Sequence, residues 1–171
     1  MGLFSRWRKE ERTAVQARPT EPSPSDALSE PPRPRPEDGR PVSAPLTDAE
    51  RSRISRGLEE LAARGVDIDD LAAIGAAYDR AHADAAAGRG DAAEVVELFG
   101  VAIGEHLVRR STRGWSVVTD AFGTDLGLVD ARADTVVVPH NLVSARWMRG
   151  ETGWIPGVVQ HLVGLCPRAG A

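Results

Sequence analysis

The chain has 171 residues, which is enough for one domain with an appendage, and its formal net charge is −4. Hydrophobic residues make up 42% but aromatic residues only 5%, so we expect a core of mainly aliphatic side chains. Most of the negative charge lies after residue 45, which excludes duplex nucleic acid as an expected partner because such binding needs a basic face.

Residues 1–12 are predicted to be a short basic amphipathic peptide. Leu3, Phe4 and Trp7 would share one side of a short helix, with basic side chains around them. We interpret these three residues as a docking site for a membrane surface or a partner, the alternative being a frayed terminus. No apolar run is long enough for a membrane span or a secretory signal, so we expect a cytoplasmic protein with at most peripheral membrane contact.

Residues 13–45 are predicted to be a disordered, proline-rich linker. Nine of the 12 prolines lie between Pro19 and Pro45, and large apolar residues are few. Such a segment cannot bury enough apolar surface to offset the entropy that ordering would cost. The run from Pro31 to Pro36 favours polyproline II and indicates a stiff spacer, the alternative being a ligand for a proline-binding domain.

The folded part is predicted over residues 46–171 and begins with three helices. A capping box formed by Thr47 and Glu50 starts the first helix, and Gly65 ends it. The second helix is expected to start at Asp67 and to end near residues 88–90.

The third helix is predicted to start after Asp91 and to lie at the centre of the fold. Its residues from Val95 to Leu107 are apolar on nearly every side, which is typical of a buried helix. Gly100 and Gly104 lie four residues apart on it and predict close approach of other elements to the helix backbone.

Strand patterns begin at Gly114. Residues 114–119, 124–129 and 135–138 are predicted as an antiparallel meander, with a turn at residues 120–123. Two helices follow, over about residues 141–149 and 154–165. The predicted fold class is α+β, with N-terminal helices packed on a small antiparallel β-meander and two C-terminal helices.

A series of short motifs lies in this second half in a fixed order. The motifs are Phe99-Gly100, Gly104-Glu105, Leu107, Trp115, Asp120 to Asp125, Pro139-His140-Asn141, Val143, Arg146-Trp147 and Gly150-Glu151. In this order they resemble the bacterial domain of unknown function 3806 family, over about residues 94–154. The resemblance implies a small α+β domain with a core at about residues 91–165, and it brings no catalytic residue and no cofactor. The helices before Glu94 are expected to lie outside the match.

His140 and Asn141 lie at the junction between a predicted strand and a predicted helix. They are the strongest candidates for a binding site in the sequence. Free N–H groups at a helix start attract anions, and both side chains could add donors. The alternative is structural: Asn141 or a neighbour caps the helix, and His140 packs nearby. Arg146, if it faces inward, needs a carboxylate partner, and Glu105, Asp120 and Asp125 are the candidates. A substrate-binding or an exposed arginine remains as an alternative.

Other chemistry has little support, and we predict no catalytic residue, no cofactor and no metal site. Asp79 and His82 have the spacing of a carboxylate–histidine metal pair, but Glu105-His106 has the wrong spacing for a second one. Cys166 is alone and is interpreted as a small apolar residue. Phosphate-loop and nucleophile-elbow motifs are missing from the sequence.

These observations favour a non-enzymatic binding or accessory module on a flexible tether, with a protein partner whose identity is unknown. The alternative is an enzyme or small-ligand binder with a site near His140, Asn141 and Arg146. A further alternative is an immunity-type or chaperone-like binder of one specific protein, which only size and acidic charge support.

Overall fold

A computed structural model describes residues 41–121, 123–130 and 135–168, and the structural statements below refer to these residues. The predicted N-terminal peptide (1–12) and most of the predicted linker (13–45) lie outside the described residues. The docking role of Leu3, Phe4 and Trp7 therefore stays a prediction.

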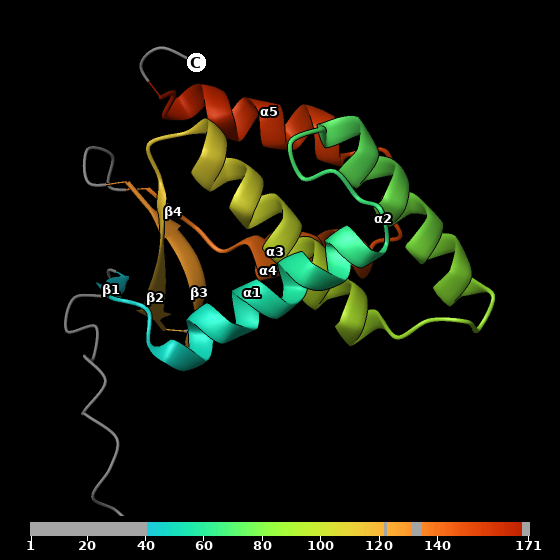
Figure 1. Ribbon diagram of the computed structural model, residues 1–171, viewed down its shortest axis with the longest axis horizontal. Coiled ribbons are helices and arrows are strands. Elements are labelled where there is room, and N and C mark those ends of the chain that lie inside the picture. Colours follow the sequence, from blue (N-terminus) through green and yellow to red (C-terminus); the bar gives the residue numbers. More distant parts are fainter. Residues whose placement is uncertain (1–40, 122, 131–134, 169–171) are drawn as a thin grey trace, which may run out of the picture. The chain divides into compact units, whose positions relative to one another are not determined.

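Four of the five helices surround the fifth, as the apolar pattern predicts (Figure 1). The central helix, α3, is in contact with the other four helices and with the sheet, and from Val95 to Leu107 nearly all of it is buried. The helices are α1 (Asp48–Ala63), α2 (Leu71–Ala86), α3 (Ala92–Arg110), α4 (Pro139–Trp147) and α5 (Ile155–Leu165).

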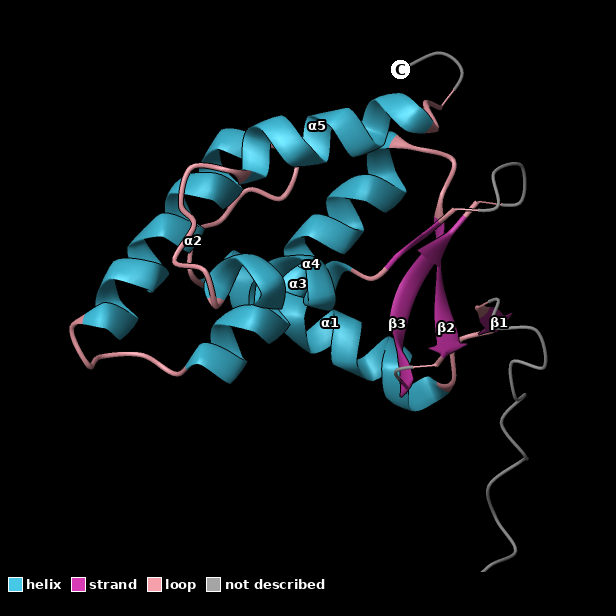
Figure 2. Cartoon of the chain, turned by 180° about the vertical axis from the view of Figure 1, so that it is seen from behind, coloured by secondary structure: helices cyan, strands magenta, loops and turns pink. Residues whose placement is uncertain are grey.

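A four-stranded antiparallel sheet lies at one side of the helices (Figure 2). The strands are β1 (Val42–Ala44), β2 (Gly114–Asp120), β3 (Gly123–Val129) and β4 (Val136–Val137), in the order β1-β2-β3-β4. Val117 of β2 is opposite Leu126 of β3, and Trp115 is opposite Leu128. Leu126 and Leu128 are fully buried in the core, so the sheet turns this face to the helices. The predicted α+β class is confirmed.

The first strand lies inside the segment that the sequence assigns to the linker. Residues 42–44 pair with residues 117–119 of β2, so the folded part begins at Val42 and not at Leu46. Pro41 and Pro45 flank these three residues and hide the strand pattern. An edge strand tolerates flanking prolines because only one of its sides pairs with a neighbour.

Two helix starts also differ from the prediction. The second helix begins at Leu71 rather than Asp67, because the Asp67 carboxylate accepts the N–H of Asp69 in a turn and Asp70 takes the N-cap position. Helix α4 begins at Pro139 rather than Asn141, since the missing N–H of proline costs nothing in the first turn. Val138 is the N-cap and makes no side-chain cap hydrogen bond, and Asn141 lies inside the helix, so a neighbour and not Asn141 takes the cap position.

The two glycines of α3 do allow the close approach that their spacing predicts. A methyl group built on Gly100 would lie 2.4 Å from Cδ2 of His140, and one on Gly104 would lie 2.0 Å from Cη2 of Trp115. Helix α4 and strand β2 therefore each place a ring directly on the backbone of α3.

Candidate functional site

His140 is the second residue of α4, and its ring is sealed against α3. Its side chain is 5% exposed, and neither ring nitrogen makes a hydrogen bond. Nε2 lies 3.5 Å from Oε2 of Glu97, and Nδ1 lies 4.0 Å from Oδ1 of Asp125. The imidazole thus faces two carboxylates without bonding to either.

Arg53 of α1 joins the same two carboxylates from the other side. Its Nε donates to Glu97 at 2.6 Å, its Nη2 donates to the second oxygen of Glu97, and its Nη1 lies 3.4 Å from Asp125. The hydrogen bonds from Arg53 hold the pKa of Glu97 below its ordinary value. Burial, and then the charge of Arg53, lowers the pKa of His140. This cluster therefore ties four elements together around a neutral histidine.

Asn141 is exposed and lines a different space. A cavity of about 180 Å³ lies between the β2–β3 hairpin and the start of α4, and Asp120, Thr124 and Asp125 line it together with Asn141. His140 and Arg146 do not line this cavity. Asp120 accepts the N–H of Gly123, and Asp125 accepts the N–H of Leu126, so both carboxylates also support the hairpin backbone.

Arg146 lies at the other end of α4 and makes none of the expected ion pairs. Its guanidinium carbon is 4.6 Å from the ring centroid of Trp154, and its Nε is 3.7 Å from Oε2 of Glu151. Glu105, one of the three candidate partners of Arg146, accepts hydrogen bonds from Trp115 and Arg109 instead. The structure therefore does not bring Arg146 together with His140 and Asn141.

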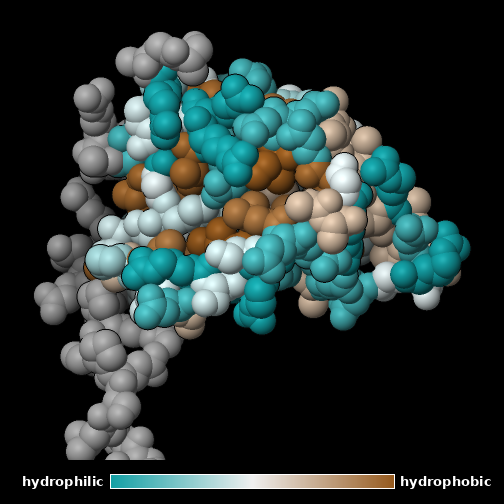
Figure 3. Space-filling view, in the orientation of Figure 1, coloured by the Kyte–Doolittle hydropathy of each residue, from teal (hydrophilic) through white to brown (hydrophobic). Residues whose placement is uncertain are grey.

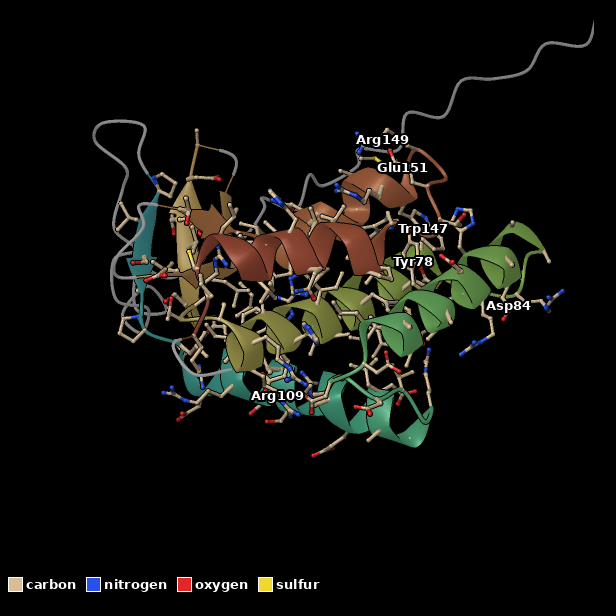
Figure 4. The ribbon with its side chains drawn as sticks, turned by 90° about the horizontal axis from the view of Figure 1, so that it is seen from above. Tyr78, Asp84, Arg109, Trp147, Arg149 and Glu151 are labelled. Carbon is tan, nitrogen blue, oxygen red and sulfur yellow. The ribbon has the colours of Figure 1, made fainter. Side chains whose placement is uncertain are left out.

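Arg146 belongs instead to an aromatic cluster between α2, α4 and α5. Tyr78 is fully buried and packs edge-on against Phe99, Trp147 and Trp154, at centroid distances of 5.5, 6.1 and 5.7 Å. Burial raises the pKa of Tyr78. Figure 4 shows Tyr78 beside Trp147, with Arg149 and Glu151 next to each other at the end of α4.

Asp79 and His82, which have the spacing of a metal pair, contact residues in and beside this cluster. The carboxylate of Asp79 accepts the N–H of Gly153 at 3.0 Å, and the ring of His82 lies 5.0 Å from that of Trp147. Within the described ranges, no group of three or more His, Cys, Asp and Glu side chains could hold a metal ion. Cys166 is buried and free. None of the described helices is both long enough and apolar enough to cross a bilayer.

No sequence motif assigns a role to His106, yet this residue lines a larger cavity. This cavity measures about 510 Å³ and lies between the α1–α2 connection, α3 and the second half of α5. Nδ1 of His106 lies 2.7 Å from the carbonyl oxygen of Ile68. The only sign of this cavity in the sequence is a histidine in the middle of a largely apolar helix. The residues around it come from segments whose packing the sequence does not predict. The lining residues are Asp69, Asp70, Leu71, His106, Arg110, Gln160, Val163, Pro167 and Arg168.

Fold and contacts together define a small α+β domain that is built on one central helix and an antiparallel sheet. The chain belongs to the family described as domain of unknown function (DUF3806), which matches residues 70–157, just over half of its length. The match begins at Asp70 and includes α2, so the expectation that everything before Glu94 lies outside the family is wrong. No curated protein matches the chain, and no solved structure does.

Proposed function

We propose that the chain is a non-enzymatic binding module, and that its folded domain binds a protein partner through the α4–α5 corner. We define this corner as Trp147, Met148, Arg149, Glu151 and Trp154. The observation that carries the proposal is Met148, whose side chain is 77% exposed although Trp147 beside it packs into the aromatic cluster. Methionine, tryptophan and arginine are enriched at protein interfaces.

The corner is held rigidly, which favours binding because little conformational entropy is lost. Gly150 and Gly153 adopt φ angles of 67° and 69°, which allow the chain to turn sharply between the helices. The N–H of Glu151 donates to the carbonyl of Arg146, and the N–H of Gly153 donates to Asp79 of α2. A preorganised surface of this kind binds with a smaller ordering cost than a mobile loop.

The charges of the corner indicate the chemistry of the partner. Glu151 lies 2.6 Å from Nε of Arg149 and 3.7 Å from Nε of Arg146, so two guanidinium groups share one carboxylate. A partner with an apolar pocket for Met148 and an acidic side chain near it complements this surface. The N-terminal residues Leu3, Phe4 and Trp7 extend the proposal as a second docking element, for a membrane surface or the same partner, on sequence grounds alone.

The alternative, an enzyme or small-ligand site at His140, Asn141 and Arg146, has less support. Its three side chains lie in separate surroundings: a sealed ionic cluster, an exposed position beside the hairpin, and the face of Trp154. The immunity-type or chaperone-like alternative is a special case of partner binding, and identification of the partner distinguishes it.

The experiment is a crosslinked pull-down from the source cells with the full-length protein. Met148→Glu places a charge on the exposed side chain, and Met148→Leu is the matched apolar control. We expect a stoichiometric partner with the native protein and with Met148→Leu, and its loss with Met148→Glu. If Met148→Glu still captures the partner, the interface lies elsewhere on the protein. If no partner is captured at all, the proposal is overturned. A triple alanine variant at Leu3, Phe4 and Trp7 tests the second docking element separately.

A further inference from the structure

The cavity beside His106 has the size of a small-ligand site and lies apart from the α4–α5 corner. Its volume of about 510 Å³ falls within the range of roughly 300–1,000 Å³ that such sites occupy. In Figure 1, the connection from α1 to α2 runs close to α5 and forms one wall. Val163 and Pro167 line the cavity at the C-terminal end of α5, whereas Trp154 precedes the N-terminal end.

The ring of His106 has one fixed tautomer. Its Nδ1 is 2.7 Å from the carbonyl oxygen of Ile68, and because a carbonyl oxygen only accepts, Nδ1 carries the proton. In the neutral ring, Nε2 then has a lone pair. His106 is 4% exposed, and Nε2 has no hydrogen-bond partner among the described residues although it is not sealed from solvent. His106 lines the cavity, so its largely buried ring offers there an acceptor that no described residue uses.

Arg168, an exposed residue, also lines the cavity and carries donors. Arg168 is held by the carbonyls of Val108 and Ser111, at 3.0 and 3.2 Å from Nη2, and its Nη1 makes no hydrogen bond to any described residue. Arg168 has no carboxylate partner among the described side chains, so its positive charge is available to a ligand.

The second arginine of the cavity is also incompletely neutralised. Nη2 of Arg110 lies 3.5 Å from Oδ1 of Asp69, whereas Nη1 of Arg109 lies 2.8 Å from Oδ2 of the same carboxylate. Part of the cavity wall is apolar and is formed by Leu71, Val163 and Pro167. An apolar wall lowers the local dielectric constant, which strengthens the electrostatic attraction between a ligand and these guanidinium groups. Figure 3, in the orientation of Figure 1, shows an apolar strip across the middle of the domain, with hydrophilic residues around it.

We propose that this cavity binds a small organic acid that carries a hydroxyl or amino group next to its carboxylate. The carboxylate pairs with Arg168 and Arg110, and the neighbouring O–H or N–H donates to Nε2 of His106. Asp70, which also lines the cavity, favours an amino group over a hydroxyl group through its charge. The ligand is larger than its end group, because the cavity has room for further atoms beside Leu71 and Val163.

The experiment titrates the full-length protein with L-lactate, L-alanine and propionate near pH 7.5 and follows the backbone amide signal of Leu71 by NMR. Propionate is the matched probe that has the carboxylate without the donor. We expect saturable shifts with lactate or alanine, and binding of propionate that is roughly tenfold weaker, since one hydrogen bond to a buried acceptor is lost.

Three variants assign the contacts. His106→Asn keeps a side-chain N–H for the Ile68 carbonyl but has no acceptor at the position of Nε2. Arg168→Gln keeps donors for the carbonyls of Val108 and Ser111 but removes the charge. Each should weaken binding roughly tenfold. His161→Asn, at an exposed position one residue beyond Gln160, should bind like the native protein. Equal binding of all three acids, native-like binding by His106→Asn, or no saturable shift with any acid would overturn the proposal.

Discussion

The indole of Trp115 occupies the space that a side chain on Gly104 would need. An added methyl group would lie 2.0 Å from Cη2 and 2.2 Å from Cζ2 of the ring, well inside van der Waals contact. The indole N–H also donates to Glu105 at 3.2 Å, so the ring cannot tilt away without losing this bond. This contact fixes the distance between the sheet and the central helix.

Gly104→Ala should therefore destabilise the protein, by about 2 kcal/mol or more, because overpacking outweighs the gain in helix propensity. Gly157→Ala is the control, since an added methyl group on this α5 residue meets nothing within 4 Å. It should leave stability unchanged or raise it by up to about 1 kcal/mol. Urea unfolding of both variants measures this, and equal stability of the two would contradict the packing argument.

The stability of the fold should decrease as the pH falls below the ordinary pKa of histidine, near 6.5. Burial lowers the pKa of His140 in the folded state, so the unfolded chain takes up this proton first. The contribution of His140 is complete above pH 6.5 and is lost as the pH falls from there toward the folded-state pKa. One proton changes the free energy of unfolding by at most about 1.4 kcal/mol per pH unit.

Urea unfolding at a series of pH values from about 7.5 to about 5, which span the ordinary pKa of histidine, tests this expectation. It compares the native protein with His140→Gln. The variant should show a shallower dependence in this window. Glu97, whose pKa is also lowered, acts in the same direction only at more acidic pH, so it does not obscure the comparison. A native protein whose stability is flat across the window would refute the role of His140.

Removal of the Arg53 charge should raise the pKa of His140. Arg53 is the second cause of the lowering after burial, while Glu97 and Asp125 act in the opposite direction and would remain. NMR titration of the His140 ring in Arg53→Gln measures the change. Arg51→Gln is the control, since Arg51 is exposed and pairs with Asp48 in its own helix. An unchanged or lower pKa in Arg53→Gln would show that Arg53 does not act on the ring.

Met148 and Trp147 should separate binding from folding. Met148→Ala should change the free energy of unfolding by no more than about 0.5 kcal/mol, because its side chain is mostly exposed. Trp147→Ala should cost about 3 kcal/mol, since its ring contacts Tyr78 and His82. Thermal and urea unfolding measure both. A large loss of stability in Met148→Ala would mean that this residue supports the fold and is no probe of the interface.

Much of the fold could be predicted because its signals are local. The capping box of Thr47 and Glu50 and the N-cap of Asp91 mark helix starts within a few residues of chain. The apolar surround of α3 predicts its burial without knowledge of its neighbours. The strand at residues 42–44 could not be predicted, because three residues between prolines show no periodicity and the strand depends on its pairing with β2.

The candidate site is where the sequence carried least information. His140 was predicted as a site-like residue from its place before a helix, but its surroundings are Arg53, Glu97 and Asp125, which come from three other elements. Arg146 was expected to pair with Glu105, Asp120 or Asp125, and it stacks on Trp154 beside Glu151 instead.

The helices, the central strands and the burial of α3 can be predicted from the sequence, since their signals lie close together in the chain. The family follows from the order of short motifs along the second half of the chain. Packing determines which charged and polar side chains from distant segments meet. His106 illustrates this: its Nδ1 contacts the carbonyl oxygen of Ile68, 38 residues away. The other residues that line its cavity come from the α1–α2 connection, α2, the end of α3, α5 and the segment after α5. Such contacts depend on how the elements pack, and no local pattern encodes them.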